Sequence, residues 1–436
     1  MSIQFDWHDS EDERWRHDHD DHRPTPHDWR PPDSQEPAQP AAAASLAQQP
    51  KGRRVATQRT THWEATRVVR YLGLGVLIGA LISLAVITIV AQRNRALARA
   101  DLQAVITVEA NALAAGDEEI FLTFQDDSDA AWQNLQKTQM DQLRSRAVSV
   151  TLTLEDFILT GDVAWATVRY QQDQVDYQRI QFYRLVAGQW KRTAPDAAYW
   201  GEEKSLETRH LIFHYREKDE ALVQALSITA ENFYSRTHLD FNVGASPQLE
   251  FYLDPDAQPT PARFNEGRFH LSSPQLTGVR LDGQLPADLL ETVAYDISLR
   301  LAMEKSGLFL RSNNFANSNW VLLQGVVFWQ LQRLVPDSRM ISGLNDQFST
   351  IASQGRFLPL TTLWPPFRFG SIERTSLALS QSYQVVAYLA NSTDPGRIPI
   401  LLRALGDDLA PDQTMQRLGL DLREFEQQWR AYALAP

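Results

Sequence analysis

Residues 71–91 form an apolar segment that contains no charged side chain. A helix rises about 1.5 Å per residue, so about 20 apolar residues match a hydrocarbon core of about 30 Å. A secretory signal peptide is the alternative, but such a peptide has a short charged start and a shorter apolar run. Here a long polar region precedes the segment. The segment therefore predicts an uncleaved, single-pass transmembrane helix.

Basic side chains are more frequent before this segment than directly after it. Those before it are Lys51, Arg53, Arg54, Arg59, Arg67 and Arg70, and those that follow closely are Arg93, Arg95 and Arg99. Cytoplasmic flanks of membrane helices carry an excess of lysine and arginine. The pattern predicts a protein of the cell membrane with its N-terminus in the cytoplasm and its C-terminal part outside.

Composition narrows the function classes. The chain has 436 residues, a formal net charge of -12 and no cysteine. The acidic balance argues against a nucleic-acid partner, because no excess of cations is available for phosphates. The missing cysteines exclude disulfides, thiolate metal sites and thiol nucleophiles. These features are typical of a bacterial envelope protein, and we expect no cofactor.

Residues 1–70 are predicted to be a disordered cytoplasmic tail, since their first part is rich in Asp, Glu, Pro, Gln and Ala. The tail also contains isolated imidazoles and indoles: His8, His17, His19, His22, His27, Trp7, Trp15 and Trp29. Histidines can bind transition metals, and isolated aromatic side chains can dock on a cytoplasmic partner. A solvated tail without a specific ligand is the simpler interpretation.

Residues 92–200 predict an α+β domain. Apolar residues recur at helical spacing up to about residue 117 and again over 130–146, and alternating segments follow. Within them, 186–189 predict a hairpin turn. The string FYRLVAGQWKRTAPDAAYWG resembles the nuclear transport factor two-like, or SnoaL-like, family. This resemblance implies a cone, with helices on a curved antiparallel sheet, and we assign no catalytic residue in it.

Residues 205–436 predict a small sheet followed by a mainly helical half. Strands are expected in ETRHLIFHYRE, QLEFYLDP and RFHLSS, and helices from about residue 286 onward. The strings ALSQSYQVVAYLANSTDPGRIPILLRAL and LGLDLREFEQQWRAYAL resemble the helices of the peptidase MA-like, gluzincin-type family. The overall fold class expected is thus α+β: a transmembrane helix, a cone and a gluzincin-like domain.

The resemblance implies a zinc centre, and this chain departs from it. In that family HExxH supplies two histidine ligands and a glutamate base, and a later helix supplies the third ligand. Here Tyr295 and Leu299 stand at the histidine positions and Asp296 at the glutamate. Gln324 stands where the third ligand belongs. Because all three ligand positions lack a suitable donor, we expect no metal and no catalytic residue, hence a pseudo-enzyme.

Two further features have alternative interpretations. His210 and His214 are four residues apart, but in a strand such side chains lie about 13 Å from each other, so they are not expected to share one zinc. Trp364, Phe367 and Phe369 form an aromatic, proline-containing segment. It is either a cleft loop that contacts a peptide or glycan, or a packed connector. Asp296 is either part of a polar site with Tyr295, a solvated helix position or a partner in a helix-packing hydrogen bond. Trp320, Phe328 and Trp329 are expected in the core.

Three functions remain open. The first is a binding or scaffolding protein whose inactive peptidase-like cleft holds a protein or peptide partner. The second is an active zinc-type metallopeptidase with unconventional ligands, and the third a purely structural envelope protein that meets a cytoplasmic partner through its tail. Ligand chemistry separates the first two, and the residues at positions 295, 299 and 324 favour the first.

Overall fold

The computed structural model describes residues 62–144, 151–244, 248–255, 267–308, 319–364, 371–392 and 394–434. Contacts divide the chain into two compact units. One contains Phe5–Arg93 and the other contains Asn94–Pro436. The predicted tail up to residue 61 and the aromatic residues Phe367 and Phe369 lie outside the described residues.

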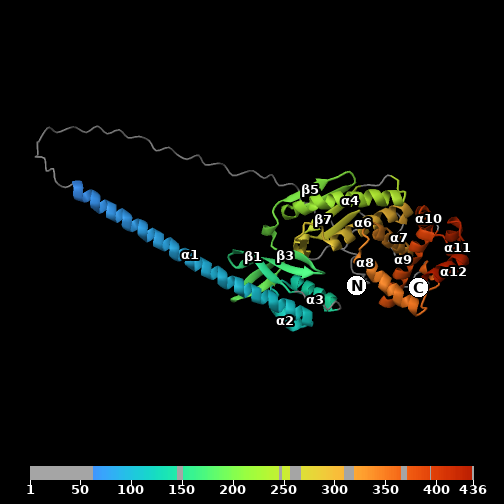
Figure 1. The fold of residues 1–436 in the computed structure, drawn as a ribbon, viewed down its shortest axis with the longest axis horizontal. Coiled ribbons are helices and arrows are strands. Elements are labelled where there is room, and N and C mark those ends of the chain that lie inside the picture. The colour runs from blue at the N-terminus through green and yellow to red at the C-terminus, as the bar shows by residue number, and fades with distance from the viewer. Residues whose placement is uncertain are drawn as a thin grey trace, which may run out of the picture. The chain divides into compact units, whose positions relative to one another are not determined.

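The long helix α1 spans His62–Ala115 (Figure 1). It includes the predicted segment 71–91, and Leu77–Ala115 is long and apolar enough to cross a membrane. Leu81 and Ile87 expose more than half of their surface. The helix starts at His62, before the predicted start, so residues 62–70 are helical rather than part of a disordered tail. This region contains no glycine or proline, and nothing in it interrupts a helix.

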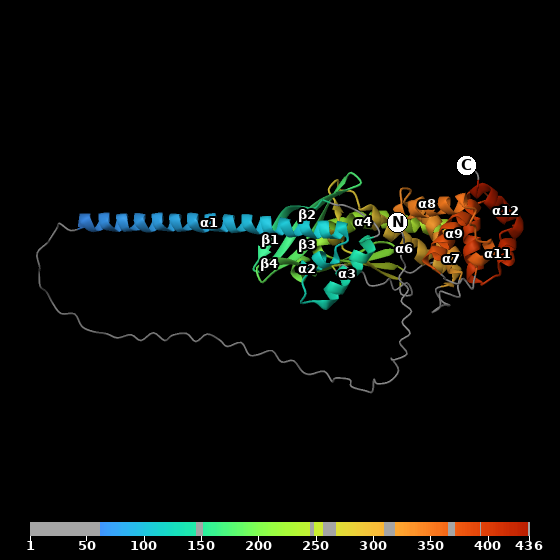
Figure 2. The same cartoon turned by 90° about the horizontal axis from the view of Figure 1, so that it is seen from below.

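An antiparallel sheet follows α2 (Glu118–Thr123) and α3 (Ala130–Arg144) (Figure 2). Its strands are β1 (Thr153–Thr160), β2 (Val163–Gln172), β3 (Val175–Val186) and β4 (Gln189–Thr193), paired in chain order. The predicted hairpin is confirmed: Val186 pairs with Gln189, and Ala187 and Gly188 have φ angles of 50° and 83°. Two positive φ angles match the twist of a two-residue hairpin.

A second, mixed sheet has the order β5 (Glu203–Glu207), β6 (Leu211–Arg216), β7 (Leu249–Asp254) and β8 (Arg268–Ser272). β5 and β6 are antiparallel, whereas β6, β7 and β8 are parallel. Helix α4 (Glu220–Asp240) connects β6 to β7. The strand expected in ETRHLIFHYRE is shorter than predicted. Strand β5 was not predicted, because its charged sequence EKSLE resembles a linker.

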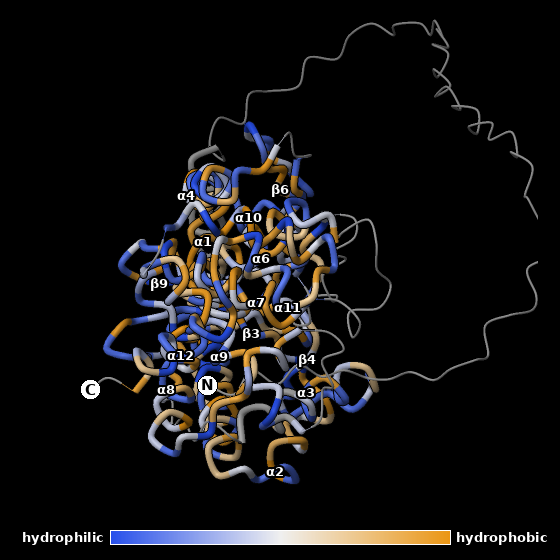
Figure 3. Tube along the Cα trace, turned by 90° about the vertical axis from the view of Figure 1, so that its right-hand side faces the viewer, coloured by the Kyte–Doolittle hydropathy of each residue, from blue (hydrophilic) through white to orange (hydrophobic). Residues whose placement is uncertain are grey.

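The C-terminal half is helical, as predicted. Its longer helices are α6 (Ala287–Ser306), α7 (Trp320–Leu334), α8 (Arg339–Ser353), α9 (Ile372–Ser392), α10 (Arg397–Gly406), α11 (Pro411–Arg417) and α12 (Leu422–Ala433). One hydrophobic core joins these helices to the second sheet, and the trace near α6 and α7 carries many hydrophobic segments (Figure 3). Trp320, Phe328 and Trp329 are buried in it, which confirms their predicted place.

The two sheets are connected through a short segment of the second half. After α5 (Pro274–Thr277), β9 (Val279–Arg280) pairs with β3 of the first sheet. The hydroxyl of Tyr170 donates a hydrogen bond of 2.9 Å to the carbonyl oxygen of Thr277. Leu276 packs against buried aromatic side chains of the first sheet. The chain is therefore a mixed α and β protein with one antiparallel and one mixed sheet.

Candidate functional site

The four positions that the peptidase resemblance singles out lie on two packed helices. Tyr295, Asp296 and Leu299 belong to α6, and Gln324 belongs to α7. The hydroxyl of Tyr295 donates a hydrogen bond of 2.8 Å to Oε1 of Gln324. Burial, together with the nearby Asp296, raises the pKa of Tyr295, so the phenol keeps its proton and acts as the donor. The hydroxyl of Tyr295 and Oε1 of Gln324 thus satisfy each other.

Gly325 explains how this part of α7 comes to be so deeply buried. A Cβ atom at this position would lie 2.6 Å from the backbone oxygen of Ser382 in α9. Glycine therefore lets the two helix backbones approach closely, as small residues do at tight helix contacts. As a result the neighbouring Gln324 is only 1% exposed.

Asp296 is a carboxyl group held in a largely apolar environment. It is 7% exposed, and burial raises its pKa to about 8. Its carboxylate makes no hydrogen bond or ion pair with any residue in the described ranges. An unpaired buried carboxyl is unfavourable when charged, so the neutral form prevails up to about pH 8. The sequence favoured a solvated helix position or a helix-packing hydrogen bond, and the burial of Asp296 corrects the first of these expectations.

The donor set does not fit a zinc ion. Leu299 is fully buried and has no coordinating atom. Nε2 of Gln324 is a buried N–H donor without a hydrogen-bond partner in the described part of the chain, and such a group repels a cation. Among the described residues no group of three or more His, Cys, Asp or Glu side chains could hold a metal ion. Of the four positions only 296 carries a carboxylate, and one carboxylate does not make a zinc site.

The tyrosine–glutamine bond leads to a testable coupling. Tyr295→Phe leaves the buried Oε1 of Gln324 without a donor and should reduce the free energy of unfolding by about 1 to 2 kcal/mol. Gln324→Met removes the acceptor at similar volume, and the double variant should lose about 1 kcal/mol less than the sum of the single variants. Urea unfolding measures all four proteins. Tyr432→Phe, at an exposed tyrosine, is the control, and purely additive losses would contradict the coupling.

Trp364 is a core residue. It is 5% exposed and belongs to the hydrophobic core of the C-terminal half. Of the two interpretations of the aromatic segment, the packed connector therefore holds at Trp364. The other two members of the predicted cleft loop, Phe367 and Phe369, lie outside the described residues.

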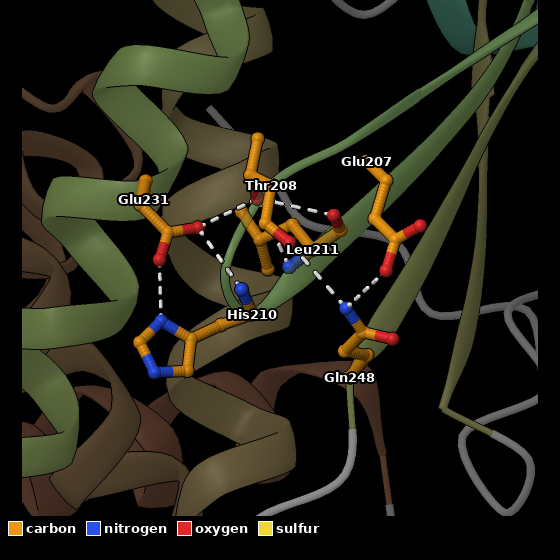
Figure 4. Close-up of polar contacts among 6 residues, drawn as sticks. All are labelled: Glu207, Thr208, His210, Leu211, Glu231 and Gln248. Atoms are coloured by element: carbon orange, nitrogen blue, oxygen red, sulfur yellow. Dashed lines mark hydrogen bonds and ion pairs between the residues drawn. The ribbon is translucent and has the colours of Figure 1, made fainter.

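His210 lies before β6 rather than in it, which corrects the expectation that both histidines occupy one strand. Figure 4 shows its ring directed toward Glu231 of α4, and its Nδ1 contacts Oε1 of that carboxylate. Oε2 of Glu231 also accepts a hydrogen bond of 2.7 Å from the hydroxyl of Thr208. The ring stacks on Tyr234 at a centroid distance of 4.4 Å. These contacts join α4 to the edge of the sheet.

His214 lies in β6 and belongs to a separate row of rings across the second sheet. It stacks on Tyr252 of β7 at 4.4 Å, and Tyr252 stacks on His270 of β8 at 4.9 Å. Nδ1 of His270 lies 2.7 Å from Oδ2 of Asp254. His210 and His214 therefore have different neighbours, and each side chain has a structural role.

A buried polar cluster between α1 and the first sheet was missed by sequence reasoning. Glu109 of α1 is 4% exposed, and its Oε1 accepts a hydrogen bond of 2.6 Å from Nε2 of Gln125. The hydroxyl of Tyr183 lies 3.0 Å from Oε2 of Glu109, and Arg192 approaches at 3.9 Å. Burial raises the pKa of Glu109, although Arg192 and both hydrogen bonds oppose the shift.

Several polar atoms of this cluster lack a partner in the described part of the chain. They are Oε1 of Gln125, Nε of Arg179 and Nε1 of Trp132, whose ring faces Arg192. Both amide atoms of Gln136 in α3 lack a partner as well. Burial lowers the pKa of Arg179, and the nearby charge of Arg192 adds to the shift. Buried groups of this kind are usually hydrogen-bonded, so an accumulation of exceptions marks a candidate binding site for a polar ligand.

The alternation of polar and apolar residues in β3 does not distinguish a buried polar cluster from a face exposed to water. Arg179, Gln181 and Tyr183 alternate with apolar residues along β3, a pattern typical of a strand with one face in water. In the structure these residues pair with Val168, Ala166 and Ala164 of β2, on the face that α1 covers. The opposite face of β3 is covered too, by Trp200. The small alanines leave room for the large polar side chains.

No family model matches the chain, and no curated protein matches its sequence. The resemblances to the SnoaL-like and peptidase MA-like families therefore depend on local residue patterns and stay predictions. The geometry of Tyr295, Asp296 and Gln324 is the observation from which a function must be argued.

Proposed function

We propose that this protein is a membrane-anchored binding or scaffolding protein whose C-terminal module is an inactive relative of the peptidase MA-like fold. In this proposal α1 crosses the membrane once, the N-terminus is cytoplasmic, and residues after 91 are extracytoplasmic. The basic flank before the apolar segment supports this orientation. A protein or peptide is the proposed partner of the module.

The hydrogen bond between Tyr295 and Gln324 carries the proposal. A metallopeptidase needs three protein ligands that leave one position open for water. Here the phenol and the amide are engaged with each other at 2.8 Å, and Leu299 offers no lone pair. A water polarised by zinc therefore has no place in the arrangement, and binding without cleavage is the function that it supports best.

Metal content and cleavage test the proposal. The full chain, purified in detergent and dialysed, should contain far less than one zinc per protein. It should also leave a peptide library intact, with and without a chelator. Stoichiometric zinc together with chelator-sensitive cleavage would overturn the proposal.

A rebuilt variant provides the matched control. Tyr295→His, Asp296→Glu, Leu299→His and Gln324→Glu together restore the ligand pattern of the resemblance. If the four positions converge as in that family, this variant should retain zinc through dialysis under the conditions in which the natural chain does not. Failure to bind zinc in a variant that still folds would remove the support for the resemblance.

One observation favours a second candidate function, a metal-free hydrolase. A buried carboxyl whose pKa is raised to about 8 can donate or accept a proton near neutral pH. If the protein is such a hydrolase, Asp296→Asn should abolish cleavage of its substrate. If it only binds, the natural chain and the variant should both leave the peptide library intact. Burial is the cause of the raised pKa of Asp296, and no contact that would activate a water or orient a substrate accompanies it among the described residues, so this candidate is the weaker one.

A further inference from the structure

A cavity of about 480 Å³ opens between the C-terminal ends of α4 and α6, the side of α7 and the first half of α10. It is separate from the positions discussed above. Lys305 of α6 lines the cavity. It lies ten residues after Tyr295 in the same helix, which is about 15 Å along the helix axis. The cavity therefore needs an explanation of its own.

Two cations line this cavity. Nζ of Lys305 donates a hydrogen bond to the carbonyl oxygen of Asn242, and Arg403 reaches the cavity from α10. Burial lowers the pKa of Lys305, and the charge of Arg403 lowers it further, so the two positive groups lie close enough to repel. Arg403 is exposed, and the charge of its guanidinium acts on Lys305 across the cavity. Two like charges that lie close together are unfavourable, and a bound anion relieves their repulsion.

The acidic residue in the wall does not neutralise this pair. Asp240 accepts a hydrogen bond of 3.0 Å from Nε2 of Gln330 and another of 3.4 Å from Nη2 of Arg333. Its charge is thus offset by Arg333, whose guanidinium also lies 4.9 Å from the ring centre of Trp329. The net charge facing the cavity is positive.

Apolar side chains form part of the remaining wall. Trp329, Pro399 and Ile400 line it, and Ile400 is 39% exposed. A site that combines an apolar wall with a few convergent polar groups is typical of a binding pocket for an organic ligand. The cation pair selects the charge of the ligand, and the apolar wall accommodates its body.

We propose that this cavity binds an organic oxyanion, a carboxylate or phosphate attached to an apolar group, through Lys305 and Arg403. The oxyanion accepts charge-assisted hydrogen bonds from the two cations, which removes their mutual repulsion. The apolar group lies against Trp329 and Ile400. This site is independent of the peptide-binding role proposed above, because it shares none of its residues.

Equilibrium dialysis of the full chain in detergent tests the site with four small probes. The probes are 4-phenylbutyrate, its neutral amide, phenyl phosphate and its neutral dimethyl ester. The two anions should bind at least about tenfold more tightly than the matched neutral compounds, and binding should weaken with added salt. The anion that binds more tightly identifies whether the natural ligand carries a carboxylate or a phosphate.

Arg403→Gln should weaken binding of the stronger anion by about tenfold or more, because one charge-assisted contact is lost. Arg403 is exposed, so the substitution leaves the fold intact. Arg423→Gln removes the same charge from an exposed position on α12 and should change nothing. Equal affinity for anion and neutral probe, equal affinity of the two variants, or no binding of any probe to the natural chain would each overturn the proposal.

Discussion

Asp296→Asn should stabilise the protein, and the gain should grow as the pH rises. The carboxyl group has a pKa of about 8 in the folded chain, raised from 3.8 by burial. Between these two values the folded state binds more protons than the unfolded state, so the stability of the natural chain falls as the pH rises. The neutral amide has no such dependence. The effect follows from burying a carboxylate that has no partner.

The size of this effect follows from the same shift. One pKa unit corresponds to about 1.36 kcal/mol, so between about pH 5 and pH 7.5 the variant should gain about 3 kcal/mol over the natural chain. Urea unfolding at a series of pH values measures the gain. Asp288→Asn, at an exposed carboxylate in the first turn of the same helix, should leave the pH profile unchanged. Parallel profiles for the natural chain and Asp296→Asn would contradict the buried charge.

Gly406→Ala should reduce the free energy of unfolding by about 3 kcal/mol or more. A Cβ atom at this position would lie 1.5 Å from the backbone oxygen of Ser306, at the end of α6. A backbone oxygen cannot move aside as the end of a flexible side chain can, so α10 must shift away from α6. Overpacking of this kind usually costs about 1 to 3 kcal/mol, and this overlap is severe.

Gly244 provides the control that separates the steric overlap at Gly406 from the general effect of replacing glycine by alanine. Gly244→Ala adds the same atom at a position where, apart from its chain neighbours, no atom of the described residues lies within 4 Å, and it should change stability by less than about 0.5 kcal/mol. Thermal and urea unfolding of the two variants in the same detergent measure the difference. Similar stabilities would show that α10 does not pack against α6 as closely as the structure indicates.

Local sequence patterns predicted most of the secondary structure. The helices expected from about residue 286 onward include α6 and α7, and residues 186–189 predicted the hairpin between β3 and β4. These signals depend on neighbours in the chain, which is why they can be interpreted without a fold. The charged strand β5 was missed for the same reason, since its side chains resemble those of a linker and only its pairing with β6 makes it a strand.

The candidate sites needed contacts between residues that are distant in sequence. The chemistry of Tyr295, Leu299 and Gln324 already indicated a poor zinc site, but their residue types did not reveal that Tyr295 and Gln324 are hydrogen-bonded. Nor did they reveal that Asp296 is buried. The cluster around Glu109 and the cavity beside Arg403 were not predicted at all, because each combines residues from separate elements.

The amino-acid sequence by itself determined the apolar length of the membrane segment, the positions of most helices and the absence of imidazole at 295 and 299. These properties are local, since they depend on side-chain type and spacing. Only the tertiary structure decided which polar groups are buried and which of them meet. Burial and pairing depend on how α6, α7, α9 and α10 pack, and that packing sets the pKa of Asp296 and the charge of the cavity.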